Sequence, residues 1–494
     1  MNQNNRASGV LLSVTSLPGP HGIGDFGKEA YQFVDLLAKA GFSLWQILPL
    51  NPIGYGHSPY QPYSSFALDE QFISLDLLHK EGLLPFVPPF HQGDEKVAYE
   101  DVRAFKLPLL RKAFEKDSAL HPYALAGYAS KNPWVRDWAL FSMFHRRYPM
   151  SWSDWPKEAR DYLKERKPLD KETKKDVSFE IWLQKKAYEQ WKKLHKYANG
   201  KGISIIGDIP FYVGFDSCDV WSELNGFLID EETYNPSFIA GVPPDYFSAT
   251  GQRWGNPIYD WDRLKATDFA MLKKRILLNS KVYDIIRLDH FRAFDTYWKI
   301  PSSCETAIDG AWIEAPGYEF FDSLFRDDPA LQKRIIAEDL GDLRPEVLVL
   351  RDHYAFPGMN VIEFTFQDAE IYHKPGFNEV NSVCYLGTHD NDTMKSYFDH
   401  LSDNDKNAWK WRLGEMGYES GDIVKDMISY CLDKAAKWAI LSAQDLLGLG
   451  EEARTNVPST VNDRNWTFKL KDFSALETAF EEIAPKLEKA GRKA

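Results

Sequence analysis

Eight short apolar runs, each bounded by turn residues, recur along the chain, and most of them are separated by segments with the periodicity of an amphipathic helix. Such a run is typical of a strand that is buried on both faces. The runs cover residues 10–14, 44–48, 204–207, 283–288, 334–337, 360–366, 382–386 and 439–442. The clearest helical pattern covers residues 28–40. Strands that alternate with helices favour a parallel sheet, and eight of them predict an α/β fold of the (β/α)8 TIM barrel type.

A doubly wound open sheet is the other fold that alternating strands and helices allow. Such a sheet commonly binds dinucleotides through a glycine-rich loop directly after its first strand. Residues 15–24 follow the first apolar run and contain glycines, but these lack the dinucleotide spacing and proline interrupts them. We therefore prefer the barrel and keep the open sheet as the alternative.

Two intervals between the predicted strands are too long for a simple crossover. The first contains charged helical segments, and we assign an inserted, mainly helical subdomain to residues 66–175. The second, residues 211–265, is rich in Gly, Pro, Asp and aromatic residues, so we expect an irregular rim or lid over the barrel mouth. Residues 1–494 then form a single barrel with both insertions at its carboxyl face.

The charge balance argues against two broad classes of partner. The chain has 59 basic and 72 acidic residues, and the resulting net charge of −13 is spread along its length. Proteins that bind nucleic acid or an anionic membrane surface carry a basic patch, so we expect neither partner. The chain has no apolar stretch of 18 residues, and hence no membrane span is predicted.

The cysteines indicate a reducing environment. Cys218, Cys304, Cys384 and Cys431 are far apart and form neither a zinc-binding spacing nor a dense disulfide scaffold. The first residues are polar and do not have the pattern of a secretory signal peptide. We therefore expect a cytoplasmic location.

Acidic residues stand at or directly after the end of four predicted strands. They are Asp208, Asp289, the pair Glu338 and Asp339, and Asp390. Strands that are buried on both faces are otherwise near-continuous apolar runs, so packing does not explain acids at these positions. The carboxyl ends of barrel strands open onto one mouth, and we expect the carboxylates to meet there. Spacing alone does not decide whether Glu338 or Asp339 faces the mouth.

Paired carboxylates are suited to the chemistry of glycosidic bonds. One attacks or stabilises the anomeric carbon and the other protonates the leaving oxygen, at a separation of about 5–5.5 Å when configuration is retained. Two acids this close push their pKa values apart, which keeps one of them protonated near neutrality. Arg287 lies on the same strand face as Asp289 and can hold that aspartate ionised. His389, next to Asp390, can donate to a sugar hydroxyl.

These residues could also have purely structural roles, or they could bind a metal ion. An Arg-x-Asp pair is most often a structural salt bridge, and Asp208 before Ile-Pro can simply cap a turn. A barrel with Asp, Glu and His at its strand ends can also hold a divalent metal ion. No His-x-His follows the first predicted strand, so we favour glycosyl transfer without a metal.

Four longer strings resemble one known family. They are GVLLSVTSLPGPHGIGD at 9–25, WQILPLNP at 45–52, SPYQPYS at 58–64 and QDLLGLG at 444–450. These strings are similar to those of the 4-α-glucanotransferase family, the amylomaltases or disproportionating enzymes of the α-amylase clan. The clan's signatures on strands four, five and seven resemble Arg287-Leu-Asp289-His290, Glu338 and His389-Asp390. The resemblance therefore covers almost the whole chain and includes its acids.

The resemblance implies a retaining double displacement that moves α-1,4-glucan segments between maltooligosaccharides or starch- and glycogen-derived chains. It implies Asp289 as the nucleophile, Glu338 as the general acid/base and Asp390 as the carboxylate that holds sugar hydroxyls. Glucose and maltooligosaccharides are the implied acceptors, and the reaction requires no cofactor. An aromatic rim with Trp254, Phe247 and Tyr246 could favour sugar over water as the acceptor.

The resemblance also implies sugar contacts around the mouth. The residues are Tyr60, Asp208, Gln252, Trp254, Arg287, His290, His389, Asn456 and, away from the active centre, Tyr55.

The chain departs from the family pattern near its C-terminus. Ser459 stands where the family commonly has glycine, three residues after the implied contact Asn456. Residues 208–212 lack the histidine that usually ends the clan's strand-three motif, which disfavours an ordinary α-amylase. No C-terminal β-sandwich is predicted beyond the barrel, and no calcium-loop pattern occurs. The rival functions are an α-glucan hydrolase and a non-catalytic glucan-binding protein.

Overall fold

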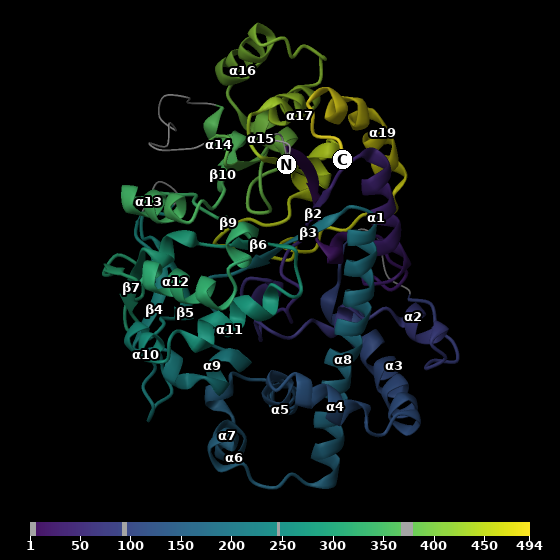
Figure 1. The fold of residues 1–494 in the computed structure, drawn as a ribbon, viewed down its shortest axis with the longest axis vertical. Helices are drawn as coiled ribbons and strands as arrows, with labels where there is room; N and C mark the ends of the chain where they lie inside the picture. Colours follow the sequence, from purple (N-terminus) through teal and green to yellow (C-terminus); the bar gives the residue numbers. More distant parts are fainter. Residues whose placement is uncertain (1–5, 91–95, 245–247, 367–378) are drawn as a thin grey trace.

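Eight parallel strands form one sheet in the computed structural model, which describes residues 6–90, 96–244, 248–366 and 379–494 (Figure 1). The sheet order is β10-β11-β12-β1-β2-β3-β6-β9. The strands are β1 (Ala7–Leu11), β2 (Leu44–Gln46), β3 (Ser204–Ile209), β6 (Ile285–Leu288), β9 (Ile335–Ala337), β10 (Gly358–Val361), β11 (Ser382–Tyr385) and β12 (Trp438–Ser442). The amide of Ala337 donates to the carbonyl oxygen of Pro357 at 2.9 Å, which brings the two end strands together. The predicted barrel is therefore confirmed, and the open sheet is excluded.

Two predicted strand boundaries were wrong. The first run was placed at 10–14, but β1 ends at Leu11 and a 3₁₀ helix, η1 (Val14–Ser16), follows. The run at 360–366 contains the end of β10 and then a short helix, α14 (Ile362–Thr365). Both segments remain buried after the strand ends, and a short buried helix has the same apolar signature as a buried strand.

Helices cover the outside of the barrel. α1 (Lys28–Ala40) has the bounds predicted from its periodicity and ends at Gly41, whose φ of 92° is left-handed and suits glycine. α8 (Lys171–Gly200) and α13 (Pro345–His353) also lie on this outer layer. α19 (Ser474–Lys489) packs on α1, with the ring centroids of Phe33 and Phe480 6.4 Å apart. None of the described helices is long and apolar enough to cross a membrane.

A group of helices lies between β2 and β3 in the sequence and occupies the lower part of Figure 1. It contains α2 (Leu75–Lys80), α3 (Tyr99–Leu120), α4 (Ala124–Lys131), α5 (Trp134–Arg147), α6 (Lys157–Arg160) and α7 (Tyr162–Glu165). α8 follows them and runs from this group back to the barrel. Its Trp182 is buried among these helices, whereas its Trp191 donates to the carbonyl oxygen of Val282 just before β6. The long helix thus ties the helical group to the barrel wall.

A second, four-stranded antiparallel sheet stands beside the barrel in the order β5-β4-β7-β8. β4 (Phe238–Val242) and β5 (Gln252–Pro257) belong to the interval that we expected to be irregular. β7 (Thr296–Pro301) and β8 (Ala311–Glu314) follow β6. The sequence did not predict this sheet, because its strands are short, partly exposed and interrupted by Gly and Pro. Tyr246 and Phe247 of the expected aromatic rim lie outside the described residues.

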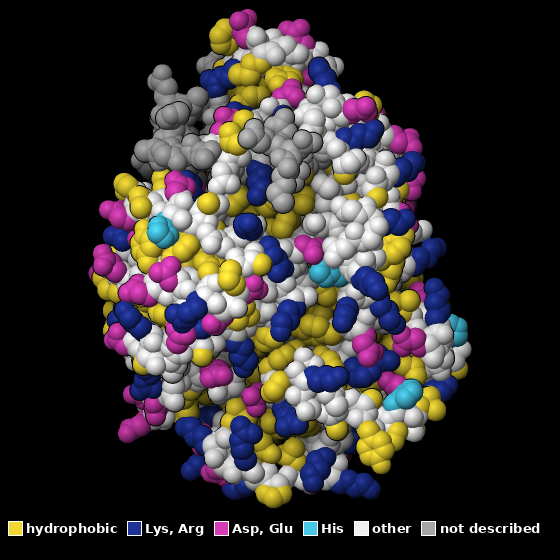
Figure 2. Space-filling view, viewed as in Figure 1, with side chains coloured by type: hydrophobic (Ala, Val, Ile, Leu, Met, Phe, Trp, Pro, Cys, Tyr) yellow, Lys and Arg dark blue, Asp and Glu magenta, His cyan; other side chains and the backbone are white. Residues whose placement is uncertain are grey.

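The surface carries both signs of charge. On the face shown in Figure 2, basic and acidic side chains are interspersed, with apolar side chains between them.

Candidate active site

The alternation of side chains along β3 and β6 directs three charged residues into the barrel mouth. Ile206 and Ile285 belong to the apolar cluster inside the barrel, while their neighbours pack outward against the helices. Side chains two positions apart on a strand share a face, so Asp208 and Arg287 also point inward. Asp208 is the register partner of Arg287 across the two strands. Asp289, directly after β6, continues the same face.

The same alternation separates Glu338 from Asp339. Ile336 lies in the inner cluster, so Glu338, two residues later, faces the mouth. Asp339 is fully buried on the other side, where its carboxylate accepts from Arg351 of α13 at 2.6 Å and from the Met359 amide at 2.8 Å. Asp339 is therefore a structural residue of the barrel wall. Sequence spacing left this choice open, and strand register decides it.

Arg287 holds two carboxylates at once. Its Nη1 lies 2.7 Å from Asp208 Oδ2 and 2.8 Å from Asp289 Oδ1. Burial opposes the charge of this guanidinium, but the two aspartates hold the pKa of Arg287 well above its ordinary value. Asp208 is buried and also accepts from the Tyr60 hydroxyl at 2.8 Å, whereas the Asp289 side chain is 26% exposed. Asp289 is thus the ion-paired carboxylate that an incoming molecule can reach.

Glu338 is held in a different way. Its Oε2 accepts from the His290 amide at 2.7 Å and its Oε1 from the Leu340 amide at 2.9 Å. His290 has a left-handed φ of 50°, a costly conformation for a residue with a Cβ. Burial raises the pKa of Glu338, Arg287 opposes the rise and Asp289 adds to it, and together they give a pKa of about 7. The mouth therefore contains one ion-paired carboxylate and one acid that is half protonated near neutrality.

His389 and Asp390 form the third part of the mouth, after β11. The His389 ring stacks on Tyr60 with centroids 4.9 Å apart, and its Nε2 lies 3.2 Å from Asp390 Oδ2. The Asn456 amide donates to Asp390 Oδ1 at 2.6 Å. Burial acts against ionisation, yet His389 and Asn456 hold the pKa of Asp390 below its ordinary range. Burial also opposes protonation of His389, but Asp390 raises the pKa of that imidazole.

β5 of the second sheet brings Trp254 to the same mouth. The edge of its indole meets the His290 ring, with centroids 4.9 Å apart and an angle of 84°, and its Nε1 donates to Gln252 Oε1 at 3.1 Å. Burial lowers the pKa of His290 to about 4, so the imidazole is neutral at pH 7. Its Nε2 is buried without a hydrogen-bond partner in the described part of the chain. A neutral imidazole in this position can bond to a hydroxyl group.

The structure brings together all the expected site residues except Tyr55. Tyr55 lies in the 3₁₀ helix η2 (Tyr55–His57), and 77% of it is exposed. Asn456 was expected to contact substrate, and the structure adds that its amide is bonded to Asp390.

Trp466 was not predicted as a site residue. Its ring is buried, with its centroid 5.7 Å from Tyr60 and 6.0 Å from His389. It has a left-handed φ of 67°, and its carbonyl oxygen accepts from the Tyr99 hydroxyl at 2.7 Å. A tryptophan between polar residues near the C-terminus was the available signal, but only the fold places it behind Tyr60.

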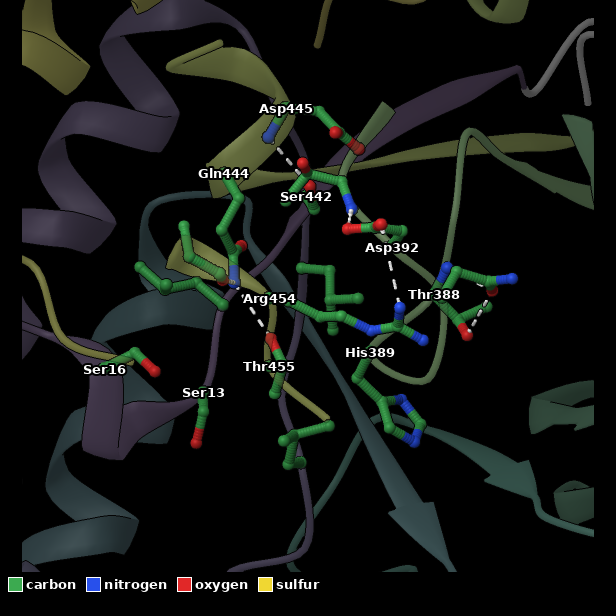
Figure 3. A pocket seen from close by; sticks show the side chains of 16 residues that line it. Ser13, Ser16, Thr388, His389, Asp392, Ser442, Gln444, Asp445, Arg454 and Thr455 are labelled. Carbon is green, nitrogen blue, oxygen red and sulfur yellow. Dashed lines mark hydrogen bonds and ion pairs between the residues drawn. The ribbon is translucent and has the colours of Figure 1, made fainter. Parts of the chain in front are cut away.

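A pocket lies behind His389, between the ends of β1, β11 and β12 (Figure 3). Polar side chains line much of it, including Ser442, Thr455 and Arg454. Among the residues that the structure describes, no cluster of three or more His, Cys, Asp or Glu side chains could hold a metal ion.

The fold and the site define a class of protein: a (β/α)8 barrel whose mouth contains an ion-paired carboxylate beside an acid of raised pKa, a combination suited to glycosidic chemistry. The family model described as 4-alpha-glucanotransferase matches residues 12–475. The chain therefore belongs to the 4-alpha-glucanotransferase family and is an enzyme of that kind, as the sequence strings indicated.

Individual relatives cover nearly the whole chain. The 4-alpha-glucanotransferase of Synechocystis is 41% identical over 94% of this chain and 94% of its own. The chloroplastic/amyloplastic 4-alpha-glucanotransferase of Arabidopsis thaliana is 36% identical over 99% of this chain and 86% of its own. The solved amylomaltase of Streptococcus agalactiae, in complex with acarbose, superposes with a TM-score of 0.92. It is 34% identical and covers 99% of this chain and 100% of its own.

Proposed function

We propose that this enzyme transfers α-1,4-glucan segments between maltooligosaccharides, or chains derived from starch and glycogen, by a retaining double displacement. Glucose and maltooligosaccharides are the acceptors, and the chemistry requires neither a cofactor nor a metal ion. The observation that supports this most directly is the contrast between two neighbouring carboxylates. Arg287 pairs with Asp289, whereas burial raises the pKa of Glu338 to about 7. A nucleophile needs the first environment and a proton donor needs the second.

In the first step, an Asp289 oxygen attacks the anomeric carbon of the donor. The bond between that carbon and the glycosidic oxygen breaks as Glu338 gives its proton to the departing chain. The products are a glycosyl ester on Asp289, an ionised Glu338 and a free 4-hydroxyl on the released segment. Asp390 binds sugar hydroxyls during this step, and the 2.6 Å bond from Asn456 keeps its carboxylate oriented.

In the second step, the 4-hydroxyl of an acceptor sugar gives its proton to Glu338 and attacks the same carbon. The ester bond to Asp289 breaks, and the second inversion restores the α configuration. The reaction is transfer, and not hydrolysis, only if an acceptor sugar binds at the mouth in preference to water. Tyr60 and Trp254 are the aromatic surfaces on which sugar rings can stack, while Asp208, Arg287, His290, His389 and Gln252 supply polar contacts.

The decisive experiment uses maltotriose as the only substrate. The wild-type enzyme should produce glucose together with maltooligosaccharides longer than maltotriose. Asp289→Asn should lower the rate by about 10³-fold or more, because it removes the nucleophile. Thermal melting of the variant should remain close to that of the wild type. Near-wild-type transfer by this variant would exclude Asp289 as the nucleophile.

A fluorinated α-glucosyl donor tests the covalent intermediate. Fluorine next to the anomeric centre slows both steps, because it destabilises their oxocarbenium-like transition states, and a good leaving group on the donor restores the first step. The ester should therefore accumulate on the peptide that contains Asp289 and appear by mass spectrometry. A label on another acidic residue would reassign the nucleophile.

The same product analysis separates the rival functions. An α-glucan hydrolase releases reducing ends from maltotriose without longer products, and a non-catalytic glucan-binding protein releases neither. The rings of Tyr60 and Trp254 at the mouth favour transfer, because stacked acceptor sugar excludes water from the ester.

We also propose a domain organisation, a second glucan contact and a cellular location for this enzyme. We treat residues 66–175 and 211–265 as insertions into a single catalytic barrel of residues 1–494. Tyr55, exposed on its loop, is proposed to contact glucan outside the mouth. A cytoplasmic location agrees with the four free cysteines.

A further inference from the structure

Arg454 joins the main chains of two residues whose side chains meet at the proposed active site. It follows the 3₁₀ helix η8 (Glu451–Ala453), beyond β12. Its Nη2 donates to the carbonyl oxygen of Asp390 at 3.2 Å, and its Nε donates to that of Asn456 at 2.9 Å. The Asn456 amide in turn donates to the Asp390 carboxylate at 2.6 Å. The three residues therefore close a ring of hydrogen bonds around one carboxylate.

Arg454 also reaches Asp392, which lies two residues before the helix that follows Asp390. Its Nη1 lies 3.7 Å from Asp392 Oδ2, across the pocket behind His389 (Figure 3). Asp392 accepts from the Thr393 amide at 2.8 Å and from the Ser396 hydroxyl at 2.7 Å, at the start of α15 (Met394–His400). The guanidinium thus connects the loop that carries Asp390 to a helix as well as to Asn456.

The surroundings of Arg454 have an excess of acids. Arg454 is the one Lys or Arg among the described residues that line this pocket, and Asp392 and Asp445 line it too. Burial raises the pKa of Asp445 to about 6. Burial likewise raises the pKa of Glu363, Asp392 adds to the rise and Arg454 opposes it, and the resulting pKa is about 8. A neutral side chain in place of Arg454 would leave Asp392 and Glu363 without this cation.

We propose that Arg454 is a positioning residue for glucan transfer, which fixes the main chains of Asp390 and Asn456 so that the Asn456 amide stays on the Asp390 carboxylate. This inference rests on the role proposed above for Asp390. A carboxylate that binds sugar hydroxyls must be held in the correct orientation as well as close to them. Misplacement of a catalytic group by about 1 Å can cost about 100-fold in rate.

The first test compares Arg454→Met with a matched control at the other end of the barrel. Arg334 also donates to main-chain carbonyl oxygens, with 2.6 Å contacts to Asp284 and Ser280, but it precedes β9. With maltotriose, Arg454→Met should lower kcat by about 10- to 100-fold and change KM by less than about three-fold. Arg334→Met should keep kcat within about two-fold, even if its melting temperature falls. Equal loss of kcat in both variants, or none in Arg454→Met, overturns the inference.

The second test asks whether Arg454 acts through Asn456. Asn456→Ala and the double variant complete a mutant cycle. If both residues serve the same carboxylate, the double variant should be little slower than the slower single variant. Multiplicative losses would mean that Arg454 acts elsewhere and would overturn the inference.

The pH profile supplies a readout that a merely structural role would not change. His389, Arg287 and Asn456 are the groups that keep Asp390 ionised. Loss of the Asn456 bond should move the acid limb of kcat to higher pH in both Arg454→Met and Asn456→Ala. An unchanged acid limb in Arg454→Met contradicts the inference.

Asp390→Asn distinguishes the proposed role of Asp390 from the positioning role of Arg454. Full activity in Asp390→Asn would remove the proposed role of Asp390 itself. A collapse of kcat in Asp390→Asn, together with normal kcat in Arg454→Met, would leave the proposed function intact and reject only the positioning role.

Discussion

At the scale of single residues, the proposed chemistry of the mouth depends on two carboxylates that have different hydrogen-bond and ion-pair partners. Asp289 and Glu338 are both carboxylates, yet one pairs with a guanidinium and the other accepts hydrogen bonds from two main-chain amides. Arg287 acts on both acids, because it pairs with Asp289 and also opposes the rise in the pKa of Glu338. Glu338 still has a raised pKa, since burial outweighs that attraction.

The raised pKa of Glu338 predicts the alkaline limb of the reaction. Glu338 gives a proton in the first step, so the protonated form is active, and its fraction falls as pH rises through about 7. The rate on maltotriose should therefore decrease above about pH 7. Glu338→Gln should lower that rate by about 10² to 10⁴-fold and remove the limb.

A donor with an activated leaving group provides the control for Glu338→Gln. Such a group departs without protonation, so the variant should retain most of the first step on a nitrophenyl maltooligoside. A wild-type rate of Glu338→Gln on maltotriose would contradict the assignment.

Ser459 provides a stability prediction at a single backbone position. Its φ of 61° is left-handed, where the family commonly has glycine, and the residue is exposed. Ser459→Gly removes the Cβ strain but gives the unfolded chain more freedom, so a net gain of about 0.5 kcal/mol is expected. Chemical denaturation measures this gain. Ser459→Ala keeps the Cβ and should show no gain; equal stabilisation by both variants would disprove the strain argument.

At the scale of elements, the C-terminal tail secures the amino end of the barrel. Arg492, after α19, is fully buried and donates to main-chain carbonyl oxygens of Leu432, Lys434, Ala436 and Ala7. These contacts join the tail to the start of β1 and to the segment before β12. One long side chain thus holds segments from both ends of the chain.

Arg492→Leu should lower the free energy of unfolding by about 3 kcal/mol, because four carbonyl oxygens lose a buried donor together, although those of Leu432 and Lys434 keep a second one, from Arg6. Urea denaturation followed by tryptophan fluorescence measures the change. Lys489→Leu, on the exposed side of α19, is the matched control and should stay within about 0.5 kcal/mol of the wild type. Equal stability of the two variants would show that Arg492 does not secure the barrel.

The helices and strands also show which features of the fold sequence patterns predict. The helix over 28–40 was predicted with its observed bounds, because an amphipathic stripe and a following glycine are local signals. The ends of β1 and β10 were misplaced, because the short helices η1 and α14 follow these strands and are largely buried as well. β4, β5, β7 and β8 were missed because their pairing joins segments on both sides of β6.

At the scale of the whole molecule, two adjacent residues serve different purposes: one helps to close the barrel and the other faces the active site. Asp339 bridges β9 and β10 through Arg351 and the Met359 amide, while Glu338 faces the mouth. Adjacent residues on one strand end therefore have unrelated roles. This arrangement makes the two roles separable by mutation.

Asp339→Ala should lower the free energy of unfolding by about 3 kcal/mol or more, because Arg351 is almost fully buried and loses an ion-pair partner. At a temperature where the variant is still folded, its kcat on maltotriose should remain within about two-fold of the wild type. Calorimetry and initial rates test both parts. A folded variant with the rate loss expected of Glu338→Gln would mean that Asp339 is the catalytic acid.

The sequence by itself determined that strands alternate with helices, that acids follow the strands and which family the chain belongs to, because these are properties of neighbouring residues or of long strings. Only the tertiary structure decided that Glu338 rather than Asp339 faces the mouth, that Arg287 holds Asp208 and Asp289 together, and that Trp466 and Arg454 stand behind His389 and Asp390. These contacts join residues that are distant in sequence, and strand register, which local patterns do not encode, sets which of them meet.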